Sequence, residues 1–395
     1  MNILRTLKMR LLPPSSRSFH EAKDATLQQL DRIEDSINNS ATTIETLEKQ
    51  IQKLQMNVRT QSEHQKIYLK EIYRLQANLN TAREAQLQFF RNIPEAKGDI
   101  RLVQLATAKL AFELKKICED NGLTYWPWAG SAVAMTSRNG SIPWDDDFDV
   151  VMTREDFNKL IFLVNKSNQF QISLVYDAFV TCKQYRFSEK NPLNPCFVDI
   201  VPLDWVSSSS QETDNRLKAI NSDYKQELTE KLYGSLSYWK NNPLLFSPDS
   251  GDVVEPFPVN RSKQELEPAL QTIKGIEDTL AKYRARAIEE GIFCSKKEAK
   301  ALGFGFECYT GGSCQPLVFS QKIFFPATKN IYEGFELFDY AQPEKMCDLL
   351  YPGWPFLGND MLTLSHFPKE YLDKEGVREY LLKTISTDNQ GEAFV

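Results

Sequence analysis

The chain has 395 residues, of which 42% are hydrophobic and 25% charged, and its formal net charge is −6. This length and composition predict a globular protein of two or three domains, and the negative charge argues against a broad nucleic-acid-binding surface. Seven scattered cysteines without a C-x-x-C spacing, and three histidines far apart in sequence, argue against a disulfide framework, a structural zinc site and a histidine-based catalytic site.

The first segment, residues 1–20, carries basic residues among leucines. Arg5, Lys8 and Arg10 lie between apolar residues at helical spacing, which is typical of an amphipathic helix that rests on an anionic membrane surface. A frayed terminus explains the same residues equally well. No apolar run reaches about eighteen residues, so we expect peripheral membrane binding rather than a membrane-spanning helix.

Residues 21–95 are predicted to form a coiled coil. From Leu27 to Arg91 the sequence has neither glycine nor proline, and apolar residues recur with a heptad period. β-Branched residues at the first core position and leucines at the fourth favour a parallel dimer, so the chain is expected to form a homo-oligomer. A long amphipathic helix packed on its own domain is the competing interpretation, although its pattern would follow a period of about 3.6.

Residues 98–206 alternate between predicted helices and strands, which indicates an α/β or α+β catalytic core. Apolar spacing predicts a helix between Gly98 and Gly122. Residues 207–300 are interpreted as an inserted helical subdomain, and residues 301–395 as the last part of the catalytic domain. The expected strands are 123–129, 148–152, 171–176, 181–187, 197–202 and 323–325, and further helices are expected from residue 153 and over 343–350.

The segment "IPWDDDFDVVM" places acidic residues at the start of an apolar strand. Asp145, Asp147 and Asp149 alternate, so on an extended chain their carboxylates point to one side. Such a row would repel itself unless a cation neutralised it, and a hard divalent cation, Mg²⁺ or Mn²⁺, is the expected cofactor. A calcium loop of the EF-hand type would need glycine and glutamate where Val150 and Asp156 stand. A solvated acidic turn or a helix cap explains the pattern less well.

Two further segments complete the predicted site. Gly130 and Ser131 stand at the end of the preceding strand, where glycine lets backbone N–H groups approach a phosphate and serine adds a donor. In "CFVDIVPLDW", Asp199 lies within an apolar strand and Asp204 just after it. A buried aspartate needs a cation or a tight hydrogen-bond network, so Asp199 is the expected further ligand.

These motifs resemble those of the LicD-type phosphotransferases, which include the fukutin-related proteins. The resemblance covers roughly residues 100–205 and 323–354, and its core is "IPWDDDFD". It implies a nucleotidyltransferase-like fold and transfer of a phospho-alcohol unit, such as phosphocholine, glycerol phosphate or ribitol phosphate, from a CDP-activated donor with release of CMP. Arg138 is expected to take the place of the family's arginine, shifted by one residue.

The resulting hypothesis assigns a role to each residue. Asp147 and Asp149, assisted by Asp145, hold the metal between two donor phosphates. Asp199 completes a second metal position or accepts the proton of the acceptor hydroxyl.

The remaining predicted residues bind the donor. Gly130 and Ser131 cradle its phosphates, and Arg138 neutralises charge as CMP departs. Trp144 either forms a wall of the site or packs in the core.

Two rival functions stay open: a nucleotidyltransferase that releases pyrophosphate, and a coiled-coil scaffold with an inactive enzyme-like domain. The expected acceptor is a hydroxyl of a surface glycan. A lipid-linked acceptor would place the protein in the cytoplasm, peripheral at the inner face of the cell membrane.

Overall fold

The computed structural model describes residues 81–177, 182–241, 244–246, 263–307, 316–352, 354 and 372–386, together with three single residues, Leu47, Ile51 and Arg74. The chain divides into two compact units, residues 1–79 and 80–395, and the helices and strands named here belong to the second. The predicted membrane-surface helix and most of the predicted coiled coil lie outside the described residues. Within the described part of the chain, no helix is long and apolar enough to cross a membrane.

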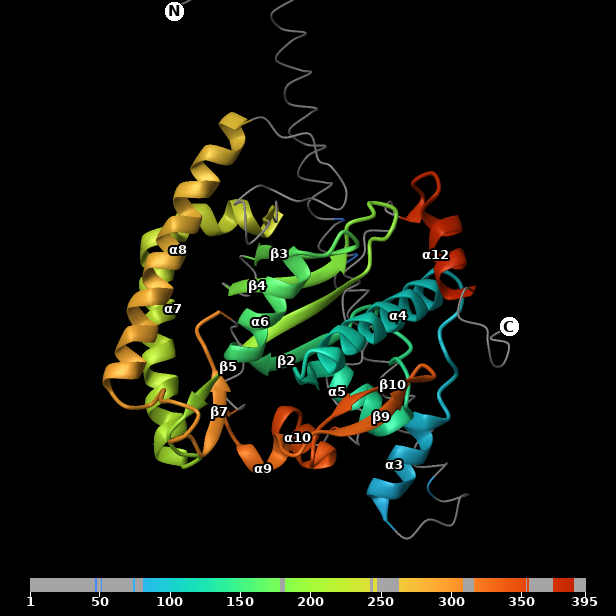
Figure 1. The fold of residues 1–395 in the computed structure, drawn as a ribbon, viewed down its shortest axis with the longest axis horizontal. Helices are drawn as coiled ribbons and strands as arrows, with labels where there is room; N and C mark the ends of the chain where they lie inside the picture. Colours follow the sequence, from blue (N-terminus) through green and yellow to red (C-terminus); the bar gives the residue numbers. More distant parts are fainter. Residues whose placement is uncertain are drawn as a thin grey trace, which may run out of the picture. The chain divides into compact units, whose positions relative to one another are not determined.

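The centre of the second unit is a mixed eight-stranded sheet (Figure 1). Its strands are β1 (Tyr125–Trp128), β2 (Asp149–Thr153), β3 (Phe170–Asp177), β4 (Cys182–Glu189), β5 (Phe197–Val206), β6 (Leu244–Phe246), β7 (Ala301–Phe304) and β8 (Val318–Ser320). They lie in the order β1–β2–β5–β4–β3–β6, and β7 pairs with β5 and β8. β2 and β5 are parallel, whereas the other pairs are antiparallel.

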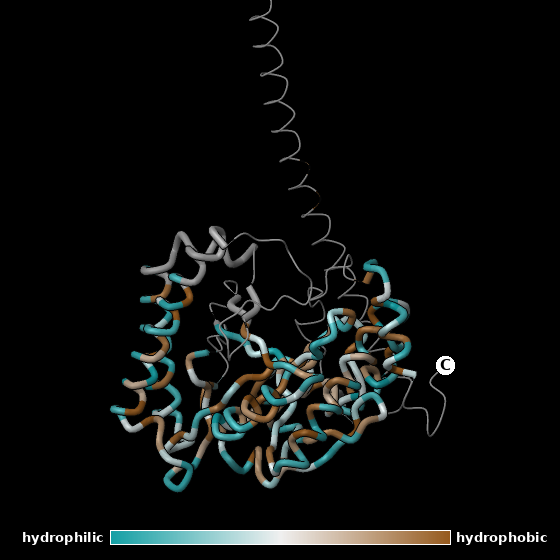
Figure 2. The backbone as a smooth tube through the Cα atoms, turned by 45° about the horizontal axis from the view of Figure 1, so that its top comes forward, coloured by the Kyte–Doolittle hydropathy of each residue, from teal (hydrophilic) through white to brown (hydrophobic). Residues whose placement is uncertain are grey.

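Helices cover both faces of β5, and all ten residues of this strand are buried. The helices are α4 (Asp99–Asp120), α6 (Arg154–Asn165), α7 (Gln211–Asn241) and α8 (Lys263–Glu289). Side chains of α4 and α6 form one core with Val198 and Ile200, while side chains of α7 and α8 form another with Val201 and Leu203. α7 and α8 lie side by side (Figure 1), and brown and teal alternate along the coloured parts of both helices (Figure 2). The helical region after β5 therefore packs into the same domain through its apolar face.

α3 (Ala82–Arg91) is where the described residues meet the predicted coiled coil. A capping box between Thr81 and Glu84 begins this helix. Its side chains Ala85 and Phe90 are buried within the domain. The heptad pattern predicts Phe89 as a core position here, whereas Phe90 is the buried residue, so α3 packs on the domain through a face that this pattern does not predict.

The predicted elements of the core are observed with small shifts, and one is wrong. Thr153 caps α6 as expected, its hydroxyl accepting from the N–H of Asp156 at 3.2 Å, and α10 (Pro343–Leu350) has its predicted bounds. The strand expected at 323–325 is instead the end of a short helix, α9 (Gln321–Phe324), because Phe324 turns into the core and packs edge-on against Trp126 with centroids 5.0 Å apart. The elements without a prediction are α5 (Ala129–Arg138), β6, β7, β8, β9 (Thr328–Tyr332), β10 (Phe335–Asp339) and α12 (Val377–Ser386).

Candidate active site

Two of the predicted metal-binding carboxylates lie on the parallel pair β2–β5. Asp149 begins β2, and its register partner on β5 is Asp199. Register partners on neighbouring strands point to the same face of a sheet. The structure therefore brings these two aspartates together, although they are far apart in sequence. Asp145 and Asp147 lie in the loop that enters β2; Asp145 is buried and Asp147 is half-buried.

The row of register partners continues onto β4, where Arg186 lies opposite Asp199. Its Nε donates to Oδ1 of Asp199 at 2.9 Å, and its guanidinium lies 3.8 Å above the ring centroid of Phe197. Arg186 was not among the predicted site residues. A signal was present in the segment "CKQYRFSE", where every second residue from Gln184 to Ser188 is polar. The structure pairs this strand with β5.

The predicted Gly-Ser pair lies at the N-terminus of α5, against the acidic loop. The hydroxyl of Ser131 accepts a hydrogen bond from the backbone N–H of Asp149 at 2.8 Å. A Cβ added at Gly130 would lie 2.6 Å from Oδ2 of Asp145, which leaves no room for a side chain. Ala129, at the junction of β1 and α5, has a positive φ of 49°, a conformation that costs a non-glycine residue roughly 1–2 kcal/mol. The pair thus packs helix, strand and acidic loop together, while its contact with phosphate stays a prediction.

A glutamine of α4 holds the acidic loop from the other side. Gln104 is buried, and its Nε2 donates to the carbonyls of Ile142 at 3.0 Å and Asp145 at 2.7 Å. Two hydrogen bonds from one rigid helix thereby set the position of the backbone from which the carboxylates project.

The turn of the β9–β10 hairpin holds the beginning of the same loop. Oε1 of Glu333 accepts from the N–H of Ser141 and from Arg101, each at 2.7 Å, and the hydroxyls of Ser141 and Tyr332 lie 2.9 Å apart. Burial raises the pKa of Glu333, but the hydrogen bonds from Arg101 and Ser141 outweigh it, so the net pKa lies below its usual value. Glu333 is therefore held as a carboxylate that anchors this loop.

Arg138 and Trp144, both predicted donor-binding residues, make other contacts in this structure. The guanidinium of Arg138 donates to the carbonyls of Phe90 at 2.7 Å and Ile93 at 3.0 Å, fastening α3 to the end of α5. Burial lowers the pKa of Arg138. Trp144 is half-buried, packs against the core, and its ring lies 6.5 Å from that of Phe90. Their proposed roles at the phosphates remain predictions.

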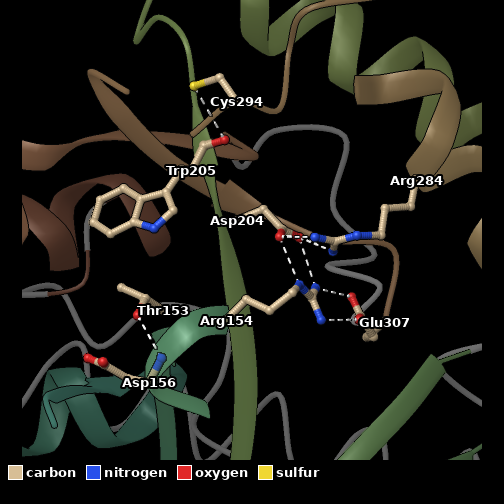
Figure 3. A network of polar contacts seen from close by, with 8 residues as sticks. All are labelled: Thr153, Arg154, Asp156, Asp204, Trp205, Arg284, Cys294 and Glu307. Atoms are coloured by element: carbon tan, nitrogen blue, oxygen red, sulfur yellow. Dashed lines mark hydrogen bonds and ion pairs between the residues drawn. The ribbon is translucent and has the colours of Figure 1, made fainter. Parts of the chain in front are cut away.

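Asp204, the second aspartate of the β5 segment, belongs to a separate network (Figure 3). It lies five positions after Asp199, an odd number, so the two side chains point to opposite faces of the strand. Arg154 and Arg284 each bind both of its carboxylate oxygens at 2.6–2.8 Å, and Arg154 also binds Glu307. Burial raises the pKa of Asp204, but the two arginines outweigh it and the net pKa is lowered.

The donor chemistry of the acidic site suits a hard divalent cation, since its ligands would be carboxylate oxygens. Asp149 and Asp199 are neighbours by register, but Oδ1 of Asp199 lies against Arg186. Within the described ranges, no three acidic, histidine or cysteine side chains converge closely enough to hold a metal ion. The residues fit such a cation in type and strand position, and their side chains would have to regroup around it.

Comparison with known proteins identifies one domain in this chain. Residues 122–238 match the family model described as the LicD/FKTN/FKRP nucleotidyltransferase domain. The match begins just before β1 and ends within α7, so it contains the acidic row, Arg186 and Asp199. No curated protein matches the chain.

Proposed function

Given that the chain belongs to the LicD-type family through its domain at residues 122–238, we propose that it transfers a phospho-alcohol unit from a CDP-activated donor to a hydroxyl of a surface glycan. The family match supports a transferase of this general type, in line with the resemblance of the "IPWDDDFD" segment. The proposal adds the donor, the acceptor and the release of CMP.

The observation that supports the proposal best is the register pairing of Asp149 with Asp199. It places two carboxylates side by side next to the N-terminus of α5, whose backbone N–H groups favour an anion. Asp145, Asp147, Asp149 and Asp199 would hold Mg²⁺ or Mn²⁺, which supplies charge neutralisation for a bound diphosphate. The chain has three histidines, and two of them lie before residue 80. We therefore expect a carboxylate to act as the base for the acceptor hydroxyl, and Asp199 is our candidate.

The direct test incubates the purified full-length protein with CDP-choline, CDP-glycerol or CDP-ribitol, Mg²⁺ and glycan acceptors, and measures CMP. Asp149→Asn and Asp199→Asn are expected to reduce CMP release at least about 100-fold, because transfer depends on metal-held phosphates. The matched control is Asp223→Asn, an exposed aspartate of α7 paired with Arg286. Pyrophosphate released from a nucleoside triphosphate instead of CMP would favour the nucleotidyltransferase. A folded protein that releases neither would favour the scaffold.

The N-terminal segments suggest how such an enzyme reaches its acceptor. We propose that the part of the segment 21–95 that precedes α3 joins the chains into a homo-oligomer. We also propose that residues 1–20 bind the anionic inner face of the cell membrane, where a lipid-linked glycan would be available. Several weak amphipathic helices on one oligomer bind a surface more tightly than one helix does. Sedimentation with anionic vesicles tests this proposal: a variant lacking residues 1–14 that pellets as well as the full chain would contradict it.

A further inference from the structure

Arg186 shares the row of register partners with the two site aspartates, and no role has been assigned to it. We propose that Arg186 binds a phosphate of the donor, and that it stays beside Asp199 until a divalent cation takes over that carboxylate. This inference rests on the proposed function, because it assigns a diphosphate ligand and a cation to the same site.

Arg186 lies in one row with the two site aspartates. Asp149 on β2, Asp199 on β5 and Arg186 on β4 are successive register partners, so their side chains share one face of the sheet. A ligand whose phosphates are held by a cation at the two aspartates would have Arg186 as the next side chain along the row. A guanidinium is the side chain best suited to that place, because its planar fork matches phosphate oxygens.

The contacts of Arg186 separate it from a purely structural arginine. It donates to Asp199 through Nε alone, at 2.9 Å, and its side chain keeps 22% of its surface exposed. Asp204, on β5 with Asp199, is an example of a structural pairing, since Arg154 and Arg284 each donate to both of its carboxylate oxygens. A ligand that draws Arg186 away from Asp199 therefore breaks one arginine–carboxylate hydrogen bond, whereas each arginine of Asp204 is held by two.

The surroundings of Arg186 are also suited to a polar ligand. On β4, Gln184 and Ser188 share its face, and on β3 its register partner is Ser173. Ser173 and Ser188 are buried, and Oε1 of Gln184 is buried without a hydrogen-bond partner in the structure. Buried polar groups of this kind usually have partners. A sugar or alcohol hydroxyl of the CDP-activated substrate would donate the hydrogen bond that Oε1 of Gln184 lacks.

Electrostatics links Arg186 to the cation. A guanidinium beside Asp199 neutralises one carboxylate of a crowded acidic site, and a divalent cation at the same carboxylate would repel it. If the Arg186 guanidinium moves from Asp199 to a bound diphosphate, this repulsion is removed and its positive charge neutralises part of the charge of the phosphates. Metal binding and donor binding are then expected to strengthen each other.

The test uses the full-length protein and two probes, Mn²⁺ alone and CDP in the presence of Mn²⁺, both measured by titration calorimetry. Arg186→Gln is expected to bind Mn²⁺ at least about fivefold more tightly than the wild type. Fivefold is the effect of repulsion between two unit charges about 4 Å apart in water, and the divalent cation carries twice that charge. The same variant is expected to bind CDP at least about tenfold more weakly, because it lacks a charged hydrogen-bond donor. Arg186→Lys should show an intermediate affinity for CDP, since lysine keeps the charge and loses the fork.

The matched control is Arg284→Gln, which removes an arginine from the other buried aspartate of β5 and should change neither affinity. If Arg186→Gln binds Mn²⁺ more tightly and CDP as the wild type does, the phosphate role is refuted. If both affinities fall together in both Arg186 variants, the arginine is structural and the inference is wrong. A wild type that binds Mn²⁺ but not CDP would refute the proposed function, which separates the two failures.

Discussion

Gly130 is the residue at which one methyl group would disturb the candidate site most directly. In Gly130→Ala the new Cβ would lie 2.6 Å from Oδ2 of Asp145, whereas ordinary contact begins at 3.4 Å. The difference of 3.4 − 2.6 = 0.8 Å has to come from movement of the carboxylate or of α5. Asp145 is only 8% exposed, so its side chain has little room to turn away.

Two opposing terms set the expected change in the free energy of unfolding. Alanine in place of glycine stabilises a helix by up to about 1 kcal/mol. Overpacking a buried contact costs about 1–3 kcal/mol. We therefore expect Gly130→Ala to lie between no change and a loss of about 3 kcal/mol. The displaced carboxylate should reduce CMP release by about 100-fold, as a misplacement of about 1 Å can.

A double-mutant cycle tests this reasoning. Gly130→Ala, Asp145→Ala and the double variant are unfolded in urea and compared with the wild type. In the Asp145→Ala background the close contact is absent, so Gly130→Ala should stabilise by up to about 1 kcal/mol. An equal effect of Gly130→Ala in both backgrounds would show that positions 130 and 145 do not interact, and the packing argument would be refuted.

Three further predictions follow from the buried charges. Asp204→Asn should lose about 3–5 kcal/mol of stability in urea unfolding, because it leaves two arginines facing a neutral group. In calorimetry it should keep the affinity for Mn²⁺ that Asp199→Asn loses. If Asp204→Asn loses the Mn²⁺ affinity and Asp199→Asn loses the stability, their assigned roles are exchanged. The pKa of Glu333 is lowered on folding from 4.5, so its contribution is present above pH 4.5 and lost as pH falls through the folded pKa. Glu333→Gln should cost about 1–3 kcal/mol near pH 7, and a cost that does not shrink in acid would contradict the sign. Burial raises the pKa of Asp339 from 3.8, so the wild type loses stability as pH rises above 3.8 through the folded pKa. Asp339→Asn should become more stable relative to the wild type across that window. Free energies of unfolding measured against pH would show this.

The elements of the core that the sequence determined are those specified by local patterns. The apolar spacing between Gly98 and Gly122 defines α4, because a helix must bury one face. Thr153 caps α6, because a hydroxyl at that position satisfies a free N–H of the first turn. The apolar run after the aspartates predicted β2, but of the alternating Asp145, Asp147 and Asp149 only Asp149 lies within the strand, and the other two belong to the loop before it.

The partners of the acidic strand were decided by the tertiary structure. The sequence offered both Asp199 and Asp204 as nearby carboxylates, and the register of β2 against β5 selects Asp199, because a shift of one residue would turn the other face toward the site. Arg186 joins the row through the pairing of β4 with β5, which no local pattern specifies. Gln104 and Glu333 reach the acidic loop from a helix and a hairpin that are distant in sequence, and only packing of the folded chain brings them there.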